Sequence, residues 1–379
     1  LVRFTCEFFK SLLFLVYVAA AKTCTPAQVA IAWLLDKEMV TSVIAGASSP
    51  AQMAENAAAT DISLTGSEIE ALADTLRGGP GGADGALHMR PNLERISPAD
   101  LLHPTSPRVG FGTAPVAIEG RPDTRTAVAT IKAAIAAGAK LVDTADAYCI
   151  SSPREHGYGE RLVAKALREM GSDAVEVLVA TKIGEWRPGN GTWQLRGRPE
   201  YLKNACEAGL RSLEVEAIGL LQLHRPDPTV PIEESVGAMN DLVRAGKAHA
   251  IGVCNVTNDE LKAAMAVAHL SSVQNRMSFA TGRTDVLDRC EAEGLVFIAH
   301  SPFGGPGGAR RLLGSSTLAN LAQRHNLTTH AAALSVLTST SESLVAIPGT
   351  TKPERAAQNS GVQTVHLSQS DLDEFRSAL

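Results

Sequence analysis

The sequence of 379 residues predicts an α/β protein: a (β/α)8 TIM barrel preceded by a partial α/β repeat fragment. Three observations support this prediction. Short β-rich runs alternate with amphipathic helical stretches eight times between about residue 93 and the C-terminus. Runs such as LLQL and VFIA are continuously apolar, which is typical of parallel strands covered on both faces. Eight such units match the count and the length, about 250 residues, of a (β/α)8 barrel.

The eight units follow one another along the chain. Strands are expected within residues 107–115, 140–148, 174–182, 217–224, 248–255, 271–275, 295–302 and 344–349, and helices within 123–138, 159–170, 198–213, 232–246, 258–268, 284–294, 316–325 and 352–359. A doubly wound open sheet is the alternative arrangement of such units. No Gly-x-Gly-x-x-Gly follows the first strand, which disfavours the dinucleotide-binding version of that fold.

Composition excludes several classes of protein. Hydrophobic residues make up 45% of the chain and charged residues 20%, which suits a globular core. The net charge is −5 and no long run of Lys or Arg occurs, so nucleic acid is not an expected partner. Six cysteines are scattered without the close pairs of zinc sites or disulfide frameworks, which predicts reduced thiols, no metal site and a cytoplasmic protein.

The first residues loosely resemble a signal peptide, with two basic residues before an apolar stretch from Leu12 to Val18. That stretch is too short to span a membrane. A buried helix is the alternative interpretation, and the absence of a disulfide pattern argues against export. No membrane association is therefore expected.

The chain carries an early version of its own ending. VIAGASSPAQMAEN, from Val43 to Asn56, is similar to AIPGTTKPERAAQN, from Ala346 to Asn359, with a displacement of 303 positions and no gap. The match extends to both sides, so the duplicate covers about residues 22–77. We therefore predict an apolar segment plus partial duplicate over 1–77, a Gly-rich linker over 78–92 and the barrel over 93–379.

A single barrel unit cannot bury its own apolar face. The early copy, with a strand expected around TSVIAG, must stay partly disordered, dock outside a barrel or replace the native eighth unit. It has Ala45, Ala47 and Gln52 where the late copy has Pro348, Thr350 and Arg355. We predict that the late copy completes the barrel and that residues 1–88 are a fusion remnant, with Met89 near the original start.

Ionisable residues gather where a barrel places its chemistry, at the carboxyl ends of the strands. Asp143 and Tyr148 follow the second strand, Lys182 closes the third and His224 closes the fourth. Each has an ordinary structural explanation when it is taken alone. Their common position at one rim indicates a catalytic site.

The motifs around these residues resemble those of the aldo-keto reductase family. VDTADAY, VATK and LLQLH are similar to the segments that carry its Asp, Tyr, Lys and His tetrad, and GVCN, VQN and IPGTTKPERAAQN to its nicotinamide and adenosine-phosphate segments. The resemblance covers about residues 105–379. It implies reduction of an aldehyde or ketone with NADP(H). Alternatives are a pyridoxal reductase or pyridoxine dehydrogenase type of activity, a non-catalytic NADPH-binding regulatory subunit, and a non-catalytic fusion protein.

Residue chemistry suggests a role for each member of the tetrad. Tyr148 is expected to donate the proton, and Lys182 to stabilise the phenolate that remains. Asp143 would keep Lys182 charged and in place, while His224 would donate a hydrogen bond to the substrate oxygen of a small carbonyl compound. The site is expected to need no metal.

The resemblance also assigns a cofactor site. Asn255 and Gln274 match positions that hold the nicotinamide carboxamide, and the Arg355 guanidinium favours NADPH over NADH because it can grip a phosphate. Cys254, Met277 and His300 depart from the Ser, Tyr and aromatic residues common at these positions, so stacking on the nicotinamide is less firmly expected. The remaining predicted cofactor residues are Gly112, Thr113, Ser301, Pro302, Gly304, Gly349, Thr350, Lys352, Gln358 and Asn359.

Overall fold

A computed structural model of the chain describes residues 18–19, 21–22, 24–36, 40, 42–43, 49–66 and 68–69, and then 97–102, 106–150, 152–280, 284–305, 308, 312, 314–365 and 367–377. The chain divides into two compact units, Leu1–Met89 and Arg90–Leu379.

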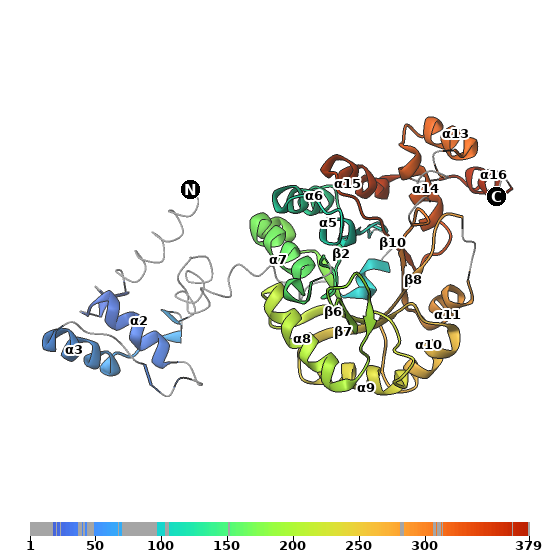
Figure 1. Ribbon diagram of the computed structural model, residues 1–379. Helices are drawn as coiled ribbons and strands as arrows, with labels where there is room; N and C mark the ends of the chain where they lie inside the picture. The colour runs from blue at the N-terminus through green and yellow to red at the C-terminus, as the bar shows by residue number, and fades with distance from the viewer. Residues whose placement is uncertain are drawn as a thin grey trace. The chain divides into compact units, whose positions relative to one another are not determined.

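The second unit is built on an eight-stranded parallel sheet (Figure 1). Its strands neighbour one another in chain order: β1 (Phe111–Gly112), β2 (Leu141–Asp143), β3 (Leu178–Ile183), β6 (Ile218–Leu223), β7 (Ala248–Cys254), β8 (Ser272–Arg276), β9 (Val296–His300) and β10 (Leu344–Ile347). Every neighbouring pair is parallel. Six of these strands fall within the predicted ranges, and β3 and β8 each extend one residue beyond theirs.

Backbone hydrogen bonds between the first and last strand regions close the sheet. Gly110 donates to the Ala346 carbonyl at 2.8 Å, and Ala346 donates to the Arg108 carbonyl at 2.9 Å. Val109 forms a parallel bridge with Ala346. The predicted (β/α)8 barrel is thereby confirmed, and the open-sheet alternative is wrong.

Helices surround the barrel as an outer ring (Figure 1). They are α6 (Thr124–Ala136), α7 (Tyr158–Met170), α8 (Pro199–Leu213), α9 (Ile232–Arg244), α10 (Asn258–Met265), α11 (Asp285–Glu293), α13 (Ser316–Arg324), α14 (Thr329–Thr338), α15 (Pro353–Ser360) and α16 (Gln369–Ser377). Side-chain caps fix several starts: Asp123 accepts from the Thr126 amide, and Thr257 forms a capping box with Glu260. Capping residues of this kind allow the helix N-termini to be predicted from the sequence.

Apolar side chains fill both sides of the sheet. A large cluster lies between strands and helices, and a smaller one fills the barrel interior, with Leu141, Leu178 and Val296 at the starts of their strands. Leu101, from the short helix η3 (Pro98–Leu102), belongs to the interior cluster. The barrel is therefore plugged at its amino-terminal end, and its carboxyl end is left for a site.

Some short elements were not predicted. β4 (Glu185–Trp186) and β5 (Gln194–Leu195) form an antiparallel pair, and the segment RPGNGTW between them is a loop. Strands of two residues carry too little alternation to be recognised in a sequence. The short helix α5 (Ala114–Ala117) was likewise not predicted.

The first unit contains α2 (Pro26–Leu35), α3 (Pro50–Ala57) and η1 (Ala58–Asp61). Val18, Ala19 and Val29 form a small buried cluster. Only Ser42 and Val43 of the expected TSVIAG strand are described, and neither is in a strand. The linker predicted at 78–92 and most of the apolar stretch at 12–18 lie outside the described residues. In the described part of the chain, no helix is long and apolar enough to cross a membrane.

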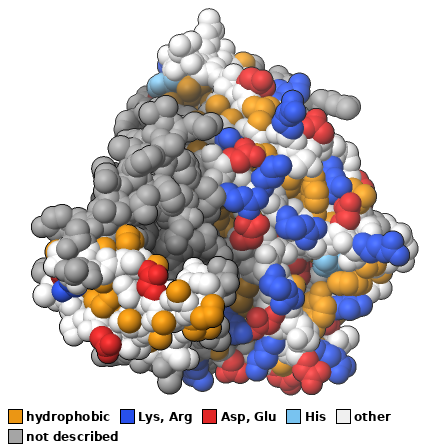
Figure 2. All heavy atoms as spheres, turned by 90° about the vertical axis from the view of Figure 1, so that its left-hand side faces the viewer, with side chains coloured by type: hydrophobic (Ala, Val, Ile, Leu, Met, Phe, Trp, Pro, Cys, Tyr) orange, Lys and Arg blue, Asp and Glu red, His pale blue; other side chains and the backbone are white. Residues whose placement is uncertain are grey.

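Charges of both signs are interspersed on the face drawn in Figure 2. Several are paired between elements at the barrel surface, such as Lys132 with Glu169 at 3.0 Å and Lys203 with Asp241 at 3.2 Å. Exposed pairs of this kind contribute little to stability. Lys132 and Lys203 are thus each neutralised by a carboxylate on a neighbouring helix.

Candidate active site

A buried ion pair forms the base of the site. Lys182, near the end of β3, donates to Asp143 Oδ1 at the end of β2 at 2.5 Å, and each side chain is only 1% exposed. Lys182 Nζ also donates to the Thr144 carbonyl at 2.8 Å and to Tyr148 Oη at 3.3 Å. Three of the four predicted catalytic residues therefore form one hydrogen-bonded chain.

Lys182 keeps its charge in this environment. Burial lowers the pKa of its amine, but the Asp143 carboxylate more than offsets burial, and the pKa is raised above its usual value. Asp143 is itself held by amides, because Gln274 and Gln222 donate to its Oδ2 at 2.7 and 3.3 Å. The pair is fixed from both sides.

Tyr148 is positioned by the loop between β2 and α7. Gly159, in the first turn of α7, has no room for a Cβ, which would lie 2.7 Å from Thr144 Oγ1 and 3.0 Å from Tyr148 Cβ. This glycine allows the helix to pack against the loop. Burial raises the pKa of the Tyr148 phenol to about 12, although Lys182 opposes this rise. The phenol therefore holds its proton at neutral pH.

His224 follows β6 and is buried against Glu185 of β4. Its Nδ1 lies 3.4 Å from Glu185 Oε2, and its ring packs edge-on against those of Tyr148 and Trp193, with centroids 5.6 and 6.3 Å away. Burial, with Lys182 nearby, lowers the pKa of His224 well below its ordinary value. The imidazole is neutral at physiological pH and can donate one hydrogen bond.

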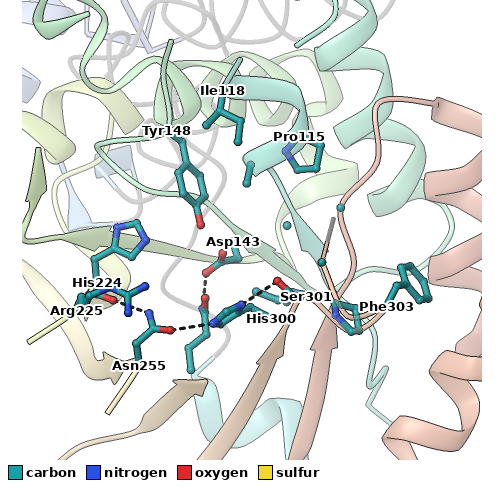
Figure 3. Close-up of a pocket in the computed structure, with 17 residues that line it drawn as sticks. Pro115, Ile118, Asp143, Tyr148, His224, Arg225, Asn255, His300, Ser301 and Phe303 are labelled. Atoms are coloured by element: carbon teal, nitrogen blue, oxygen red, sulfur yellow. Dashed lines mark hydrogen bonds between the residues drawn. The ribbon is translucent and has the colours of Figure 1, made fainter. Parts of the chain in front are cut away.

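These side chains border a pocket of about 510 Å³ at the carboxyl end of the barrel (Figure 3). Tyr148 and His224 reach it from one side, while Pro115 and Ile118 supply apolar walls. Further residues along the pocket are Gly112, Ala114, Asp143, Arg225, Asn255, Gln274, His300, Ser301, Pro302, Phe303, Gly305, Ile347 and Gly349. The cavity combines apolar walls with a few directed polar groups, as small-molecule sites do.

Asn255 and His300 are joined below the pocket. His300 Nε2 donates to Asn255 Oδ1 at 3.0 Å, and Asn255 Nδ2 donates to the His224 carbonyl at 3.0 Å. Both Asn255 and Ser301 have positive φ angles, 58° and 54°, which turn the chain sharply after their strands. Burial lowers the pKa of His300 to about 4, so its ring is neutral.

Gly349 and Gly112 lie against each other where β10 meets β1. A Cβ on Gly349 would lie 2.6 Å from the Gly112 carbonyl oxygen and 2.6 Å from Pro115 Cδ. The glycine is therefore required by the closure of the barrel.

Further along, the start of α15 presents free cations. Lys352 and Arg355 are exposed there, and neither is paired with an anion within the described residues. Asn359 is buried in the same helix, and its Oδ1 has no partner among the described groups. Cationic side chains beside a helix N-terminus suit a phosphate.

The predicted site residues divide into two groups. Ten of them line the pocket: Asp143, Tyr148, His224, Gly112, Asn255, Gln274, His300, Ser301, Pro302 and Gly349. The others, Lys182, Thr113, Gly304, Thr350, Lys352, Arg355, Gln358 and Asn359, are not among its described lining residues. Lys182 nevertheless contacts Tyr148 directly.

Sequence reasoning missed Arg225, Glu185 and the apolar wall of Pro115, Ile118 and Phe303. Arg225 directly follows His224 at a strand end, which was a usable signal. Trp193 borders His224, whereas Trp186 stacks on His156 with centroids 4.1 Å apart. Within the described ranges, no group of three or more His, Cys, Asp or Glu side chains could hold a metal ion.

The chain is similar to known proteins in both sequence and fold. The model of the Aldo/keto reductase family matches residues 5–77 and 108–379. "Probable aldo-keto reductase 1" of Glycine max is 32% identical over 280 residues, which cover 66% of this chain and 79% of the relative.

Solved structures match the barrel. The glycerol dehydrogenase AKR11B4 from Gluconobacter oxydans is 26% identical, with a TM-score of 0.62 over 72% of this chain and 90% of that protein. An aldo/keto reductase from Klebsiella pneumoniae in complex with NADP and acetate is 25% identical, with a TM-score of 0.61 over 72% of this chain and 91% of that protein.

Proposed function

This chain belongs to the aldo/keto reductase family, and from that premise we propose that it reduces an aldehyde or ketone to the alcohol with NADPH, with Tyr148 as the proton donor. It is an NADP-dependent oxidoreductase, as the family match and the NADP-bound neighbour indicate. The single observation that supports the role of Tyr148 is its phenol at the pocket, 3.3 Å from the buried Lys182 ammonium.

NADPH, when bound, supplies the hydride to the carbonyl carbon. Tyr148 gives its proton to the oxygen, and the phenolate that remains faces Lys182 Nζ. Asp143 holds that ammonium in place and keeps it charged. Because the pair is buried, its field on the phenol is weakly screened by water. Bulk solvent then returns the proton to Tyr148.

His224 orients the substrate. Its neutral imidazole lies beside Tyr148 in the pocket and has one N–H to donate. A carbonyl oxygen between the two rings would accept hydrogen bonds from both. Such an arrangement favours the charge that develops on oxygen as the carbon is reduced.

The donor set fits a nicotinamide adenine dinucleotide. Gln274 uses its amide NH2 on Asp143 and keeps Oε1 to accept from a carboxamide, and Asn255 lies at the adjacent strand end. Lys352 and Arg355, exposed beside the start of α15, would meet the adenosine phosphate. The loop with Ser301, Pro302 and Gly304 would lie along the pyrophosphate.

We also propose that residues 22–77 duplicate the C-terminal part of the barrel. The bounds of α2, α3 and η1 each lie 303 positions before those of α14, α15 and η6 (Gly361–Thr364). Thr25 and Thr328 cap their helices in the same way. The family match to residues 5–77 supports the same interpretation.

A purified-protein screen tests the proposed function. Aldehydes, ketones and pyridoxal are offered with NADPH, and the loss of its absorbance is followed. We expect turnover of at least one class of carbonyl compound, and NADPH preferred over NADH. Tight NADPH binding without turnover of any carbonyl would instead indicate a regulatory, cofactor-binding protein.

A further inference from the structure

Arg225 stands on the wall of the catalytic pocket without a role in the proposed reaction. It follows His224 directly, and its side chain is 50% exposed. Figure 3 shows it beside His224 and Asn255, on one side of the space that Tyr148 enters. Among the described residues that line the pocket, it is the only Lys or Arg.

Glu185 fixes one edge of the Arg225 guanidinium. Its Oε1 accepts from Arg225 Nε at 3.3 Å, while Oε2 lies 3.4 Å from His224 Nδ1. The Glu185 side chain is only 7% exposed, so this carboxylate is buried behind the arginine. The buried Glu185 carboxylate thus orients the arginine, whereas His224 Nδ1 has no hydrogen-bond partner among the described groups.

The terminal edge of the guanidinium remains available. Within the described part of the chain, no group pairs with Arg225 Nη1 or Nη2. This edge presents two parallel N–H donors, the geometry that grips a planar carboxylate or a phosphate in a bidentate manner. The terminal edge is therefore free to bind a ligand in the pocket.

No neighbouring group among the described residues neutralises the positive charge of Arg225 on the side that faces the pocket. Lys182 and Asp143 neutralise each other in the barrel interior. His224 and His300 are neutral, because burial lowers the pKa of each, that of His300 to about 4. Glu185 is the one anion next to Arg225, and it contacts the Nε edge and not the terminal edge.

We infer that the preferred substrates are carbonyl compounds that also carry an anionic group, a carboxylate or a phosphate, held by the terminal nitrogens of Arg225. The apolar walls of Pro115 and Ile118 would cover the body of such a molecule. This inference rests on the proposed function, since it names the substrate class of the same site.

Paired substrates test it in the full-length protein with NADPH. In the first pair, 4-carboxybenzaldehyde is compared with its neutral methyl ester, and in the second, pyridoxal 5′-phosphate with pyridoxal. We expect kcat/KM to favour at least one anionic member by about 10-fold to 100-fold, the effect of a charge-assisted bidentate contact. The substrate pair that shows the preference identifies the anion as a carboxylate or a phosphate.

Three variants sharpen the comparison. Arg225→Met should lower kcat/KM for the anionic member far more than for the neutral member and so remove the preference, while Arg225→Lys, which keeps the charge without the fork, should retain part of it. Arg211→Met is the matched control and should keep the full preference, because this exposed arginine of α8 has no ion-pair partner among the described residues. If Arg225→Met fails to fold, the comparison of Arg225→Lys with the unaltered protein still tests the inference, because the preference for the anionic member should decrease.

Calorimetric binding of the product 4-(hydroxymethyl)benzoate and of its methyl ester, with NADP⁺ present, gives a readout independent of turnover. Tighter binding of the acid, lost in the Arg225 variants, supports the anion site even if no carbonyl is reduced. Reduction of neutral aldehydes without any anionic preference, or a preference that survives Arg225→Met, would overturn the inference and leave the reductase function standing.

Discussion

Lys182 shows how a single residue holds charge where charge is costly. A lysine buried without partners loses its proton, because desolvation disfavours the ammonium. Here the amine reaches Asp143, a backbone carbonyl and the Tyr148 phenol at once. The ammonium persists and faces the one phenol that the reaction needs.

At the same scale, replacing Tyr148 by Phe keeps the ring and removes the proton donor. We expect turnover to fall by at least ~100-fold, the effect typical of losing a general acid, while NADPH affinity changes little. Steady-state rates and a fluorescence titration of NADPH measure the two quantities. Tyr158→Phe, which removes a phenol from α7 outside the pocket, is the matched control. Turnover like that of the unaltered protein in Tyr148→Phe would contradict the assigned role.

The positions of individual site residues could be predicted from the sequence where these residues lie at the carboxyl ends of strands. Asp143, Tyr148 and His224 line the pocket as expected, and Lys182 lies beneath them, because parallel strands deliver their carboxyl ends to one rim. Glu185 could not be predicted in its place beside His224. It enters the site through a two-residue strand whose pairing depends on tertiary contacts and not on a local pattern.

Short elements around the pocket depend on side chains far apart in the sequence. The β4–β5 pair is braced by Arg187, which is buried, pairs with Glu119 and lies 4.2 Å from the centre of the Trp193 ring. These contacts join the pair to the segment after α5. The β4–β5 pair and its connecting loop, which carries Trp193, therefore form part of the wall beside His224.

The contact between α7 and β3 predicts a pH effect on stability. Glu160 is buried and accepts a hydrogen bond from Thr181 Oγ1 at 2.7 Å, and burial raises its pKa to about 7. The unfolded chain loses this proton near the ordinary value of about 4.5, and the folded protein only near 7. The free energy of unfolding is therefore greatest below the lower value and decreases as pH rises through this window.

Glu160→Gln keeps the acceptor and removes the titration. We expect it to stabilise the protein at pH 8 by up to about 3 kcal/mol and to change little at pH 4.5. Thermal unfolding at the two pH values measures the difference. Glu176→Gln, at a surface carboxylate paired with Lys140, should not become more stabilising as pH rises. Equal destabilisation by Glu160→Gln at both pH values would show that the titration of Glu160 has no effect on stability and would contradict this prediction.

The start of α15 should set cofactor choice. Removing Arg355 by substitution with Ala is expected to weaken NADPH binding by roughly 1.5–3 kcal/mol and to leave NADH binding nearly unchanged. Fluorescence titrations with both cofactors measure this. The variant Lys352→Ala measures how much Lys352 contributes to the same NADPH binding free energy. Equal losses for NADPH and NADH upon Arg355→Ala would place the phosphate contact elsewhere.

The barrel could be predicted from the sequence because several independent local signals indicate the same fold. Eight apolar strands, helix caps and a common rim all specify one closed parallel sheet, and the bridge between Val109 and Ala346 completes it. The first unit is a different case. Its sequence matches a barrel segment. Such a segment needs neighbouring strands to pair with, and the barrel of the second unit has only one position of this kind.

If residues 22–77 are the proposed duplicate, two copies of that segment could in principle take one position in the barrel. The late copy holds it, since β10 pairs with β9 and meets β1 within the second unit. The early copy also has Gln52 where the late copy has Arg355, so a barrel completed by the early copy would lose the proposed phosphate contact. An occasional exchange would therefore lower NADPH affinity.

A chain that begins at Met89 tests whether the first unit takes part at all. Because the eight strands and their outer helices lie within residues 97–377, we expect this shorter chain to fold, to bind NADPH with unchanged affinity and to keep its turnover within about twofold. A second measurement addresses exchange directly. In the full chain, Arg355→Ala combined with Gln52→Arg would regain NADPH affinity only if the early copy entered the barrel, so we expect no recovery beyond Arg355→Ala alone. Insolubility of the shorter chain, loss of its NADPH binding, or recovery in the double variant would each show that residues 1–88 belong to the working fold and are not a fusion remnant.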